Sequence, residues 1–413
     1  MNRKLFGSAR LVLILLMIAT MVPAVAAQGG EVRVSSYQTG FVRWRAADGG
    51  FTGWSLNGVQ INTSGELEFQ QSTALTGTDP YAPGAYNGRN YYNGGSFLVG
   101  ETTSPVITTT AFSYKEAIAS WNAVTPVGSW VEVQFKARHD TVWSKWYSLG
   151  IWASDETTVA RHSVNGQGDA DGTVYTDTFV SQNKKTGADA FQIKIRLFST
   201  NGAIAKVRNA SVAYSVSAPK SATASAGNPA LWNQSITIPE CSQMVYPDGG
   251  EVWCSPTSTS MVLGHWNSDS GACEPRVRAA VDGVYDWVYD GHGNWPFNTA
   301  YAATQGYEAY VARFTSLERA EEFIAAGVPV VMSIAWGKKD LTNASVSSTN
   351  GHLLVLVGFD ASGNPIVNDP AASTDADVTR TYLRSEFEPL WLTKSGGTVY
   401  LIYPQGMSVP SIP

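Results

Sequence analysis

The sequence predicts two domains: an N-terminal antiparallel β-sandwich, jelly-roll-like, over residues 31–216, and a C-terminal α+β domain over residues 232–405. A leader of 27 residues would leave about 385 residues, more than one ordinary hydrophobic core accommodates. Up to residue 216 apolar residues recur with the two-residue period of strands, whereas helical spacing appears later. The 39 glycines, 14 tryptophans and a charged fraction of only 15% also indicate turn-rich β-structure.

Residues 1–27 have the pattern of a secretory signal peptide. Arg3, Lys4 and Arg10 accompany the apolar run LVLILLMIAT, and the small residues Val25-Ala26-Ala27 provide a cleavage site. The run is too short to span a membrane, and no later segment is long and apolar enough. We therefore expect a secreted, extracellular protein without membrane association after cleavage, in a compartment where disulfides persist.

The charge balance argues against a nucleic-acid partner. The formal net charge of −6 becomes −9 when the three leader cations are removed, and the chain has no Lys/Arg cluster. An acidic protein of this kind is poorly suited to bind nucleic acid or an anionic membrane.

The N-terminal half has the alternation of strands with one buried face. VEVQFKA (Val131–Ala137) and FQIKIRL (Phe191–Leu197) each place apolar side chains on one face and polar side chains on the other. Three further strands are expected: Phe41–Ala46, Lys145–Ala153 and Ser211–Val216. Asn-Gly turn signals separate such segments, and no helix is expected in this half. The pattern is typical of a β-sandwich.

Residues 217–231 are small, polar and proline-bearing, and they are expected to form a linker. Beyond it, three helices are expected: Ser255–Trp266, Arg276–Asp290 and Ser316–Gly327. The last is preceded by Thr315, which would form a capping box with Glu318, and it ends at a glycine. Three apolar strands should follow: Val328–Trp336, His352–Phe359 and Thr398–Tyr403. Helices followed by a buried sheet predict an α+β domain.

Cys254 begins the first of these helices. Pro256 suits a first helical turn, which puts Cys254 at or next to the N-cap, where free backbone N–H groups and the helix dipole favour a thiolate. The alternative is a half-cystine. Three cysteines are an odd number, so at least one thiol of the monomer stays unpaired, and Cys241 and Cys273 could bridge each other. Position and parity together favour Cys254 as a nucleophile.

A thiolate nucleophile needs a base, and the chain has five histidines. His265 is eleven residues further along the same helix, about 16 Å from the thiol, too far for a hydrogen bond. His139 and His162 belong to the β-rich half, and His292 in a loop stays an alternative. His352 begins a core strand, where its ring could face a helix end; the other interpretation is a solvent-exposed strand end.

A third residue should hold the imidazole. NPIVNDP (Asn364–Pro370) should form a strand antiparallel to the His352 strand, so that its end returns toward His352. Asn368 and Asp369 both lie at that end, and the sequence does not choose between them. Asn-Asp-Pro is also a common turn former.

Three motifs, WCSPTSTSMVL, GHLLVLVGFD and VNDP, together resemble the double-glycine (bacteriocin-processing) peptidase-like family of papain-fold cysteine proteases. That family has a Cys-Gly-Pro-x-[Ser/Ala] helix, a Gly-His strand with a Gly-[Phe/Tyr]-[Asp/Asn] turn, and an Asp-Pro. The motifs occur in the family's order within residues 232–405. The N-terminal half is similar to the β-domain that precedes such peptidases in some secreted bacterial proteins.

The resemblance implies a papain-like fold for residues 232–405, with Cys254 as nucleophile, His352 as general base and Asp369 as the residue that orients the base. The family also has a glutamine upstream whose side chain lines the oxyanion hole, and Gln243, eleven residues before Cys254, is the best match. Ser255 replaces the usual glycine, a departure that could reshape the backbone around the thiol without removing a catalytic group.

The function expected from these residues is a secreted cysteine peptidase that acts on a peptide or protein substrate. One alternative is an amidase or acyltransferase that acts on cell-wall peptide. Another is a protein that binds cell-surface glycan through tryptophans of its N-terminal domain, with an inactive peptidase-like domain; strand tryptophans are more often core residues. The candidates are Trp121, Trp130, Trp143, Trp146 and Trp152.

No metal or nucleotide cofactor is expected, since the chain has no H-E-x-x-H motif, no glycine-rich phosphate loop and no paired-cysteine metal spacing. The aromatic segment NWPFN (Asn294–Asn298) is expected in the core, with the wall of a cleft as its alternative.

Overall fold

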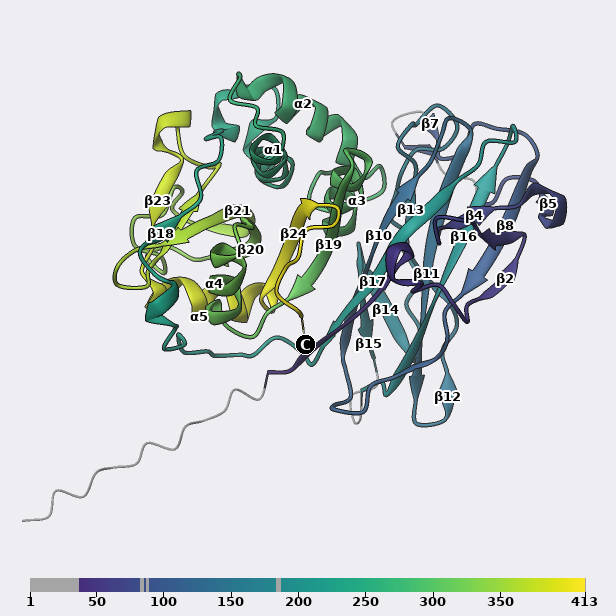
Figure 1. Cartoon of the computed structure of the whole chain (residues 1–413), viewed down its shortest axis with the longest axis horizontal. Helices are drawn as coiled ribbons and strands as arrows, with labels where there is room; N and C mark the ends of the chain where they lie inside the picture. Colours follow the sequence, from purple (N-terminus) through teal and green to yellow (C-terminus); the bar gives the residue numbers. More distant parts are fainter. Residues whose placement is uncertain (1–36, 82–84, 87–88, 183–186, 413) are drawn as a thin grey trace, which may run out of the picture. The chain divides into compact units, whose positions relative to one another are not determined.

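The computed structural model describes residues 37–412, apart from 82–84, 87–88 and 183–186 (Figure 1). The predicted signal peptide, residues 1–27, lies outside the described residues. The described residues belong to one compact unit. Within them, no helix is both long enough and apolar enough to cross a membrane.

The N-terminal part consists of two large antiparallel sheets and one small hairpin. The first sheet has the order β14 (Gly172–Tyr175), β15 (Thr178–Ser181), β10 (Glu116–Val124), β17 (Lys206–Ser215), β4 (Leu67–Phe69) and β3 (Val59–Ile61), with β1 (Thr39–Arg45) also on β17. The second has the order β12 (Val142–Trp143), β11 (Ser129–His139), β16 (Ala190–Ser199), β8 (Phe97–Thr103) and β2 (Ser55–Asn57), with β13 (Tyr147–Trp152) on β11, β5 (Leu75–Gly77) on β8 and β9 (Ile107–Thr108) on β16. The hairpin pairs β6 (Ala85–Tyr86) with β7 (Arg89–Asn90).

Five of these strands, β1, β11, β13, β16 and β17, correspond to the strands that the sequence pattern predicts. In β11 the side chains of Val131, Val133, Phe135 and Ala137 are buried, and they share one hydrophobic core with the inner face of β16 and with residues of the first sheet. The described residues before 217 contain only two short 3₁₀ turns, Ala46–Asp48 and Gln71–Thr73, and no α-helix, as expected. The N-terminal part is therefore β-rich and antiparallel.

Most of the candidate glycan-binding tryptophans are core residues. Trp121, Trp130 and Trp152 are fully buried, so their rings present no face to a ligand. Trp143 and Trp146 are half-buried, and the Lys136 ammonium lies 4.6 Å and 4.7 Å from their ring centroids.

The C-terminal part is an antiparallel sheet with five helices. The sheet has the order β19 (Tyr307–Arg313), β24 (Thr398–Pro404), β20 (Val330–Trp336), β21 (Thr349–Phe359), β22 (Pro365–Asn368) and β23 (Thr379–Thr381), with β18 (Gln234–Ser235) on β21. The helices are α1 (Cys254–Trp266), α2 (Cys273–Val284), α3 (Trp295–Thr304), α4 (Leu317–Ala325) and α5 (Arg384–Ser395). Four 3₁₀ turns occur at Pro229–Leu231, Gln243–Val245, Gly250–Val252 and Asp375–Asp377.

Helices cover both faces of this sheet. Figure 1 shows α1 and α2 on one side and α4 and α5 on the other. Alternate residues of β20 separate accordingly: Val330 and Met332 pack in the core that contains residues of α4 and α5, whereas Val331 packs in the core that contains residues of α1 and α2. This sandwiching explains why the central strands are apolar on both faces.

Two details of the predicted helices are wrong. The N-cap of α4 is Ser316 and not Thr315, and no side chain of the cap residue bonds the helix; the Glu388 carboxylate instead accepts the Leu317 N–H at 2.8 Å. The helix predicted over Arg276–Asp290 ends at Val284. The chain turns there because the buried Asp286 carboxylate accepts backbone N–H groups that follow it.

Tertiary contacts fix the segment expected to be a linker. Ser225 donates to Glu388, and the Asn228 N–H donates to Glu321 at 2.8 Å, so residues 225–228 are bound to α4 and α5. The β-rich and α+β parts also share a core, because Phe297 and Ala300 of α3 pack among the strands of the β-rich part. Phe297 is fully buried, so this residue of the NWPFN segment lies in the core.

Candidate active site

Cys254 is the first residue of α1, next to the N-cap Trp253. It is the free cysteine of the described chain and is partly exposed, whereas Cys241 and Cys273 form a disulfide. The structure thus confirms the predicted pairing and leaves one thiol at the positive end of a 13-residue helix.

Hydroxyl side chains hold α1 against the sheet. The Ser258 hydroxyl donates to the Leu353 carbonyl at 3.0 Å, which ties the second turn of the helix to the residue after His352. Ser255 is buried, and its hydroxyl lies 2.9 Å from the Tyr400 hydroxyl. The departure from glycine at this position therefore places a side chain in the interior and leaves the thiol uncovered.

His352 lies in β21 with its ring between two partners. Its Nε2 bonds Asp369 Oδ1 at 2.7 Å, and the Cys254 side chain is near enough to help raise the pKa of the imidazole. With Nε2 occupied by the carboxylate, Nδ1 is the nitrogen left to meet the sulfur. The indole of Trp336 meets the imidazole edge-on, with ring centroids 5.5 Å apart. The fold thus brings Cys254, His352 and Asp369 together at one site.

The structure selects Asp369 over Asn368 as the partner of the imidazole. Besides His352, the fully buried Asp369 carboxylate accepts the Ala371 N–H at 2.9 Å, the Ser345 hydroxyl at 2.8 Å and the Tyr382 hydroxyl at 2.6 Å.

Asn368 faces elsewhere. Its amide donates to the Pro239 carbonyl at 3.3 Å and accepts from Thr379 at 2.8 Å. The neighbouring residue therefore takes no part in holding the imidazole.

The charges of Asp369 and Cys254 stabilise the protonated imidazole of His352. Burial by itself lowers the pKa of His352, but the Asp369 carboxylate and the negative charge of the Cys254 sulfur outweigh it and raise the pKa from 6.5 to about 10. Burial likewise opposes the ionised form of Asp369, but the imidazolium and the Tyr382 and Ser345 hydroxyls lower the pKa of that carboxyl to about 2. At neutral pH the site holds a carboxylate beside a protonated histidine.

Gln243 begins the 3₁₀ turn Gln243–Val245, which is followed by the turn Gly250–Val252 and then by α1. It is buried and lines the same cleft as Cys254 and His352. Its Nε2 donates one hydrogen to the Gly250 carbonyl at 2.7 Å, and its Oε1 has no hydrogen-bond partner among the described residues. An amide nitrogen carries two hydrogens, so a second N–H is left to serve a ligand in the cleft.

The cleft around the thiol has a volume of about 1370 Å³. Gln243, Cys254 and His352 line it, together with the loop that contains Tyr289 and His292. Residues 175–178 of the β-rich part line it as well. This volume is sufficient for several residues of a bound peptide.

The other four histidines are not partners of Cys254 or Asp369. His292 lines the cleft, but its ring packs beside Trp253 and Tyr285, and burial lowers its pKa to about 4. Three histidines have structural partners: His139 bonds Ser181, His162 bonds the Ala160 carbonyl and His265 bonds the Thr237 carbonyl.

Sequence reasoning missed several residues that complete the site. Ser345, Tyr382 and Trp336 contact the histidine–aspartate pair from three separate segments, and no local pattern marks them. Trp295 of the NWPFN segment lines the cleft, so this segment contributes to both the core and the cleft wall.

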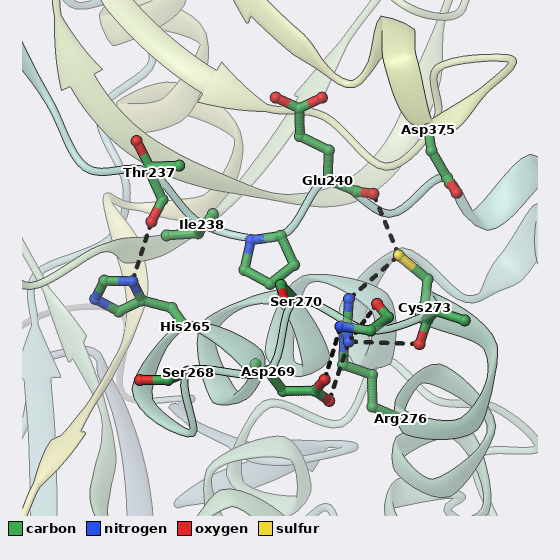
Figure 2. A pocket seen from close by; sticks show the side chains of 14 residues that line it. Thr237, Ile238, Glu240, His265, Ser268, Asp269, Ser270, Cys273, Arg276 and Asp375 are labelled. Carbon is green, nitrogen blue, oxygen red and sulfur yellow. Dashed lines mark hydrogen bonds and ion pairs between the residues drawn. The ribbon is translucent and has the colours of Figure 1, made fainter.

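A second cavity, of about 460 Å³, lies beside the C-terminal end of α1 (Figure 2). Figure 2 shows the Arg276 guanidinium between Asp269 and Cys273 at its edge, and the Arg276–Asp269 ion pair measures 3.1 Å. His265 lines this cavity too, whereas Cys254 and His352 line the first.

Both parts of the chain match models of known protein families. Residues 40–217 match the model described as Peptidase C39 N-terminal domain, and residues 235–399 match the model described as Peptidase_C39 like family. A comparison with curated proteins gives no match.

Proposed function

Since the chain is a C39 peptidase-like protein with an N-terminal domain, we propose that it is a cysteine peptidase that hydrolyses peptide bonds through Cys254, His352 and Asp369. The observation that carries the proposal is the chain of contacts from a thiol at a helix N-terminus, through a buried imidazole, to a carboxylate 2.7 Å beyond it. This is the arrangement that nucleophilic acyl transfer requires.

In the proposed reaction His352 holds the proton of Cys254, and the thiolate attacks the carbonyl carbon of the peptide bond. The negative oxygen that develops accepts hydrogen bonds from the Cys254 backbone N–H and the second Nε2–H of Gln243. His352 then gives its proton to the leaving amine, which departs and leaves a thioester. Water, deprotonated by His352, hydrolyses the thioester and restores the thiol.

The finer features of fold and location belong to the same proposal. A helix with its cysteine at the N-terminus, packed on an antiparallel sheet that supplies the histidine, supports a papain-like fold for residues 232–405. We propose a jelly-roll-like sandwich over residues 31–216 and secretion after removal of residues 1–27. The Cys241–Cys273 disulfide supports an oxidising compartment.

Alkylation gives a direct test of the nucleophile. Iodoacetamide is expected to modify Cys254 alone in the oxidised protein, because the other two cysteines are bonded to each other. Peptide mapping by mass spectrometry identifies the modified residue. The rate of hydrolysis of casein and of a peptide library should fall in proportion to the fraction of protein modified. Labelling of Cys241 or Cys273, or full hydrolysis by the alkylated protein, contradicts the proposal. Peptidoglycan fragments in the same assay separate peptide hydrolysis from action on cell-wall peptide.

Gln243 is expected to act as an oxyanion donor. Gln243→Ala should lower kcat by about 100-fold, which corresponds to about 3 kcal/mol for one such donor, and should change KM little. Gln243→Glu keeps the shape of the side chain but loses the N–H, so it should lose at least as much activity. A glutamate variant with wild-type kcat would refute the donor role.

The raised pKa of His352 also predicts how stability depends on pH. Its ion pair with Asp369 stabilises the fold fully below pH 6.5, and this contribution is lost as the pH rises toward about 10. At the acid end the contribution of Asp369 is lost as the pH falls from 3.8 toward about 2. Urea unfolding should show a decline between pH 6.5 and 10 that is smaller in His352→Gln. Equal declines in the two proteins would contradict the ion pair.

A further inference from the structure

The β-rich part supplies one wall of the cleft. The hairpin of β14 and β15 reaches it with its tip, residues 175–178, and Glu116 and Val180 of the same sheet line it as well. Cys254 and His352 line the same cavity. A substrate that occupies the cleft therefore touches both parts of the chain.

A buried carboxylate fixes the hairpin tip on the peptidase-like part. Asp177 is 6% exposed, and its Oδ2 accepts the N–H of Trp295, the first residue of α3, at 2.7 Å. Its Oδ1 accepts the Thr178 hydroxyl at 2.9 Å, and Thr176 turns the chain with a φ of 58°. The tip thus has one defined position at the positive end of a helix.

The hairpin tip, the thiol and Tyr289 line one cleft. Burial raises the pKa of Tyr289, and the charges of Asp177 and Cys254 each raise it further. Tyr289 is therefore within electrostatic reach of both groups, one from each part of the chain.

The β-rich part also holds the loop that presents Tyr289. Asp286, fully buried, accepts the Ser163 N–H from the β-rich part at 2.9 Å and the Tyr289 N–H at 3.1 Å on the same oxygen. The Trp287 N–H donates to the Arg161 carbonyl at 3.1 Å. Two elements of the cleft wall, the hairpin tip and this loop, thus depend on the N-terminal part.

Exposed apolar side chains line the cleft that contains the thiol. Four large ones line the cleft and keep much of their surface in water: Tyr175 at 64%, Val252 at 59%, Tyr289 at 48% and Met244 at 44%. They come from four separate segments, so they meet only in the folded chain. Apolar surface that gathers in this way marks a binding site, because a ligand that covers it releases the water.

Next to His352 the cleft floor is open. A Cβ added at Gly351 would meet no atom within 4 Å, so the backbone there has free space above it. An extended peptide has space to pass Gly351, and the same cleft offers four apolar side chains to it.

We propose that the hairpin tip Tyr175–Asp177 is a substrate-binding element, and that Tyr175, Met244, Val252 and Tyr289 take a large apolar side chain of the substrate beside the bond that Cys254 attacks. The identity of the occupant, a peptide, rests on the proposed function. Tyr175 determines specificity, and Asp177 is a positioning residue that acts through the hairpin.

Binding to the full chain with Cys254→Ala tests this without cleavage. Peptides that differ at one residue, Leu or Phe against Ser, are titrated by calorimetry. The apolar peptides should bind at least about tenfold more tightly, and Tyr175→Ala in the same background should remove about tenfold from their affinity only. Tyr175→Phe should retain the preference. Val142→Ala, at a residue of β12 that is 65% exposed and outside the cleft lining, should change nothing.

The outcomes separate this inference from the proposed function. Equal affinity for all peptides, or a preference that Tyr175→Ala leaves intact, overturns the inference even if the wild type hydrolyses peptides. A preference that depends on Tyr175 in a protein that hydrolyses none supports the inference and overturns the peptidase. Asp177→Ala provides a second variant: it should weaken the apolar preference while near-ultraviolet circular dichroism stays that of the folded chain.

Discussion

Replacing Cys254 by alanine is expected to lower peptide hydrolysis by a factor on the order of 10⁵ or more and to leave the fold intact. The thiol is the only group that the substitution removes, and alanine suits a first helical turn. The affinity for a peptide substrate should change little, because the cleft walls remain. Rates measured with a fluorogenic peptide, together with thermal unfolding of both proteins, check this result.

Two controls sharpen the test. Cys254→Ser keeps a hydroxyl next to His352 but is a poor nucleophile there, so it should be nearly as inactive as alanine. Cys241→Ser paired with Cys273→Ser removes two sulfurs and leaves Cys254, so the double variant should retain activity at temperatures where it is folded. Hydrolysis within tenfold of the wild type by Cys254→Ala would end the case for this nucleophile.

Asp369→Ala is expected to lower both activity and stability. The carboxylate accepts four hydrogen bonds from His352, Ala371, Ser345 and Tyr382, and its loss leaves a buried imidazolium and two hydroxyls without their acceptor. The free energy of unfolding should fall by about 3–5 kcal/mol. Because the imidazole loses its orientation, kcat should fall by about 10²- to 10⁴-fold. Urea unfolding and steady-state kinetics measure the two effects.

The neighbouring residue is the matched control. Asn368→Ala removes a side chain of similar size from the next position, but its partners are Pro239 and Thr379 and not the imidazole. It should keep kcat within a few fold of the wild type. Asp369→Asn keeps a carbonyl oxygen for Nε2 and should be more active than Asp369→Ala. If Asn368→Ala loses as much kcat as Asp369→Ala, the assignment of the third residue is wrong.

The sequence alone was sufficient for the local features of the molecule. The alternation of Val131, Val133 and Phe135 predicted a half-buried strand, and the proline two residues after Cys254 predicted a helix that starts at the thiol. The odd number of cysteines predicted that at least one stays free, and the position of Cys254 at a helix start predicted which one. Each of these predictions rests on side-chain periodicity, on the chemistry of a helix end or on a residue count. None of them depends on contacts between distant segments.

The choice between Asn368 and Asp369 needed the strand register. Successive side chains of an extended chain point in opposite directions, so one of the two must turn away from His352. The pairing of β22 with β21, which is irregular between Leu356 and Gly358, decides which one does. The predicted helix cap was wrong for a related reason. Glu388, seventy-one residues after Leu317, supplies the hydrogen-bond acceptor at the start of α4, where Thr315 was expected to form the cap.

What the sequence by itself determined is the candidate nucleophile, its candidate base and the elements that hold them. The patterns of their own segments place Cys254 at a helix start and His352 near a strand start. What only the tertiary structure decided is the surroundings of that pair. Tyr382 on the aspartate, and Asp177 at the tip of a hairpin from the other half of the chain, reach the site through contacts between segments far apart in sequence. Such contacts leave no periodic trace in the residues that make them, since packing and not local backbone preference selects them.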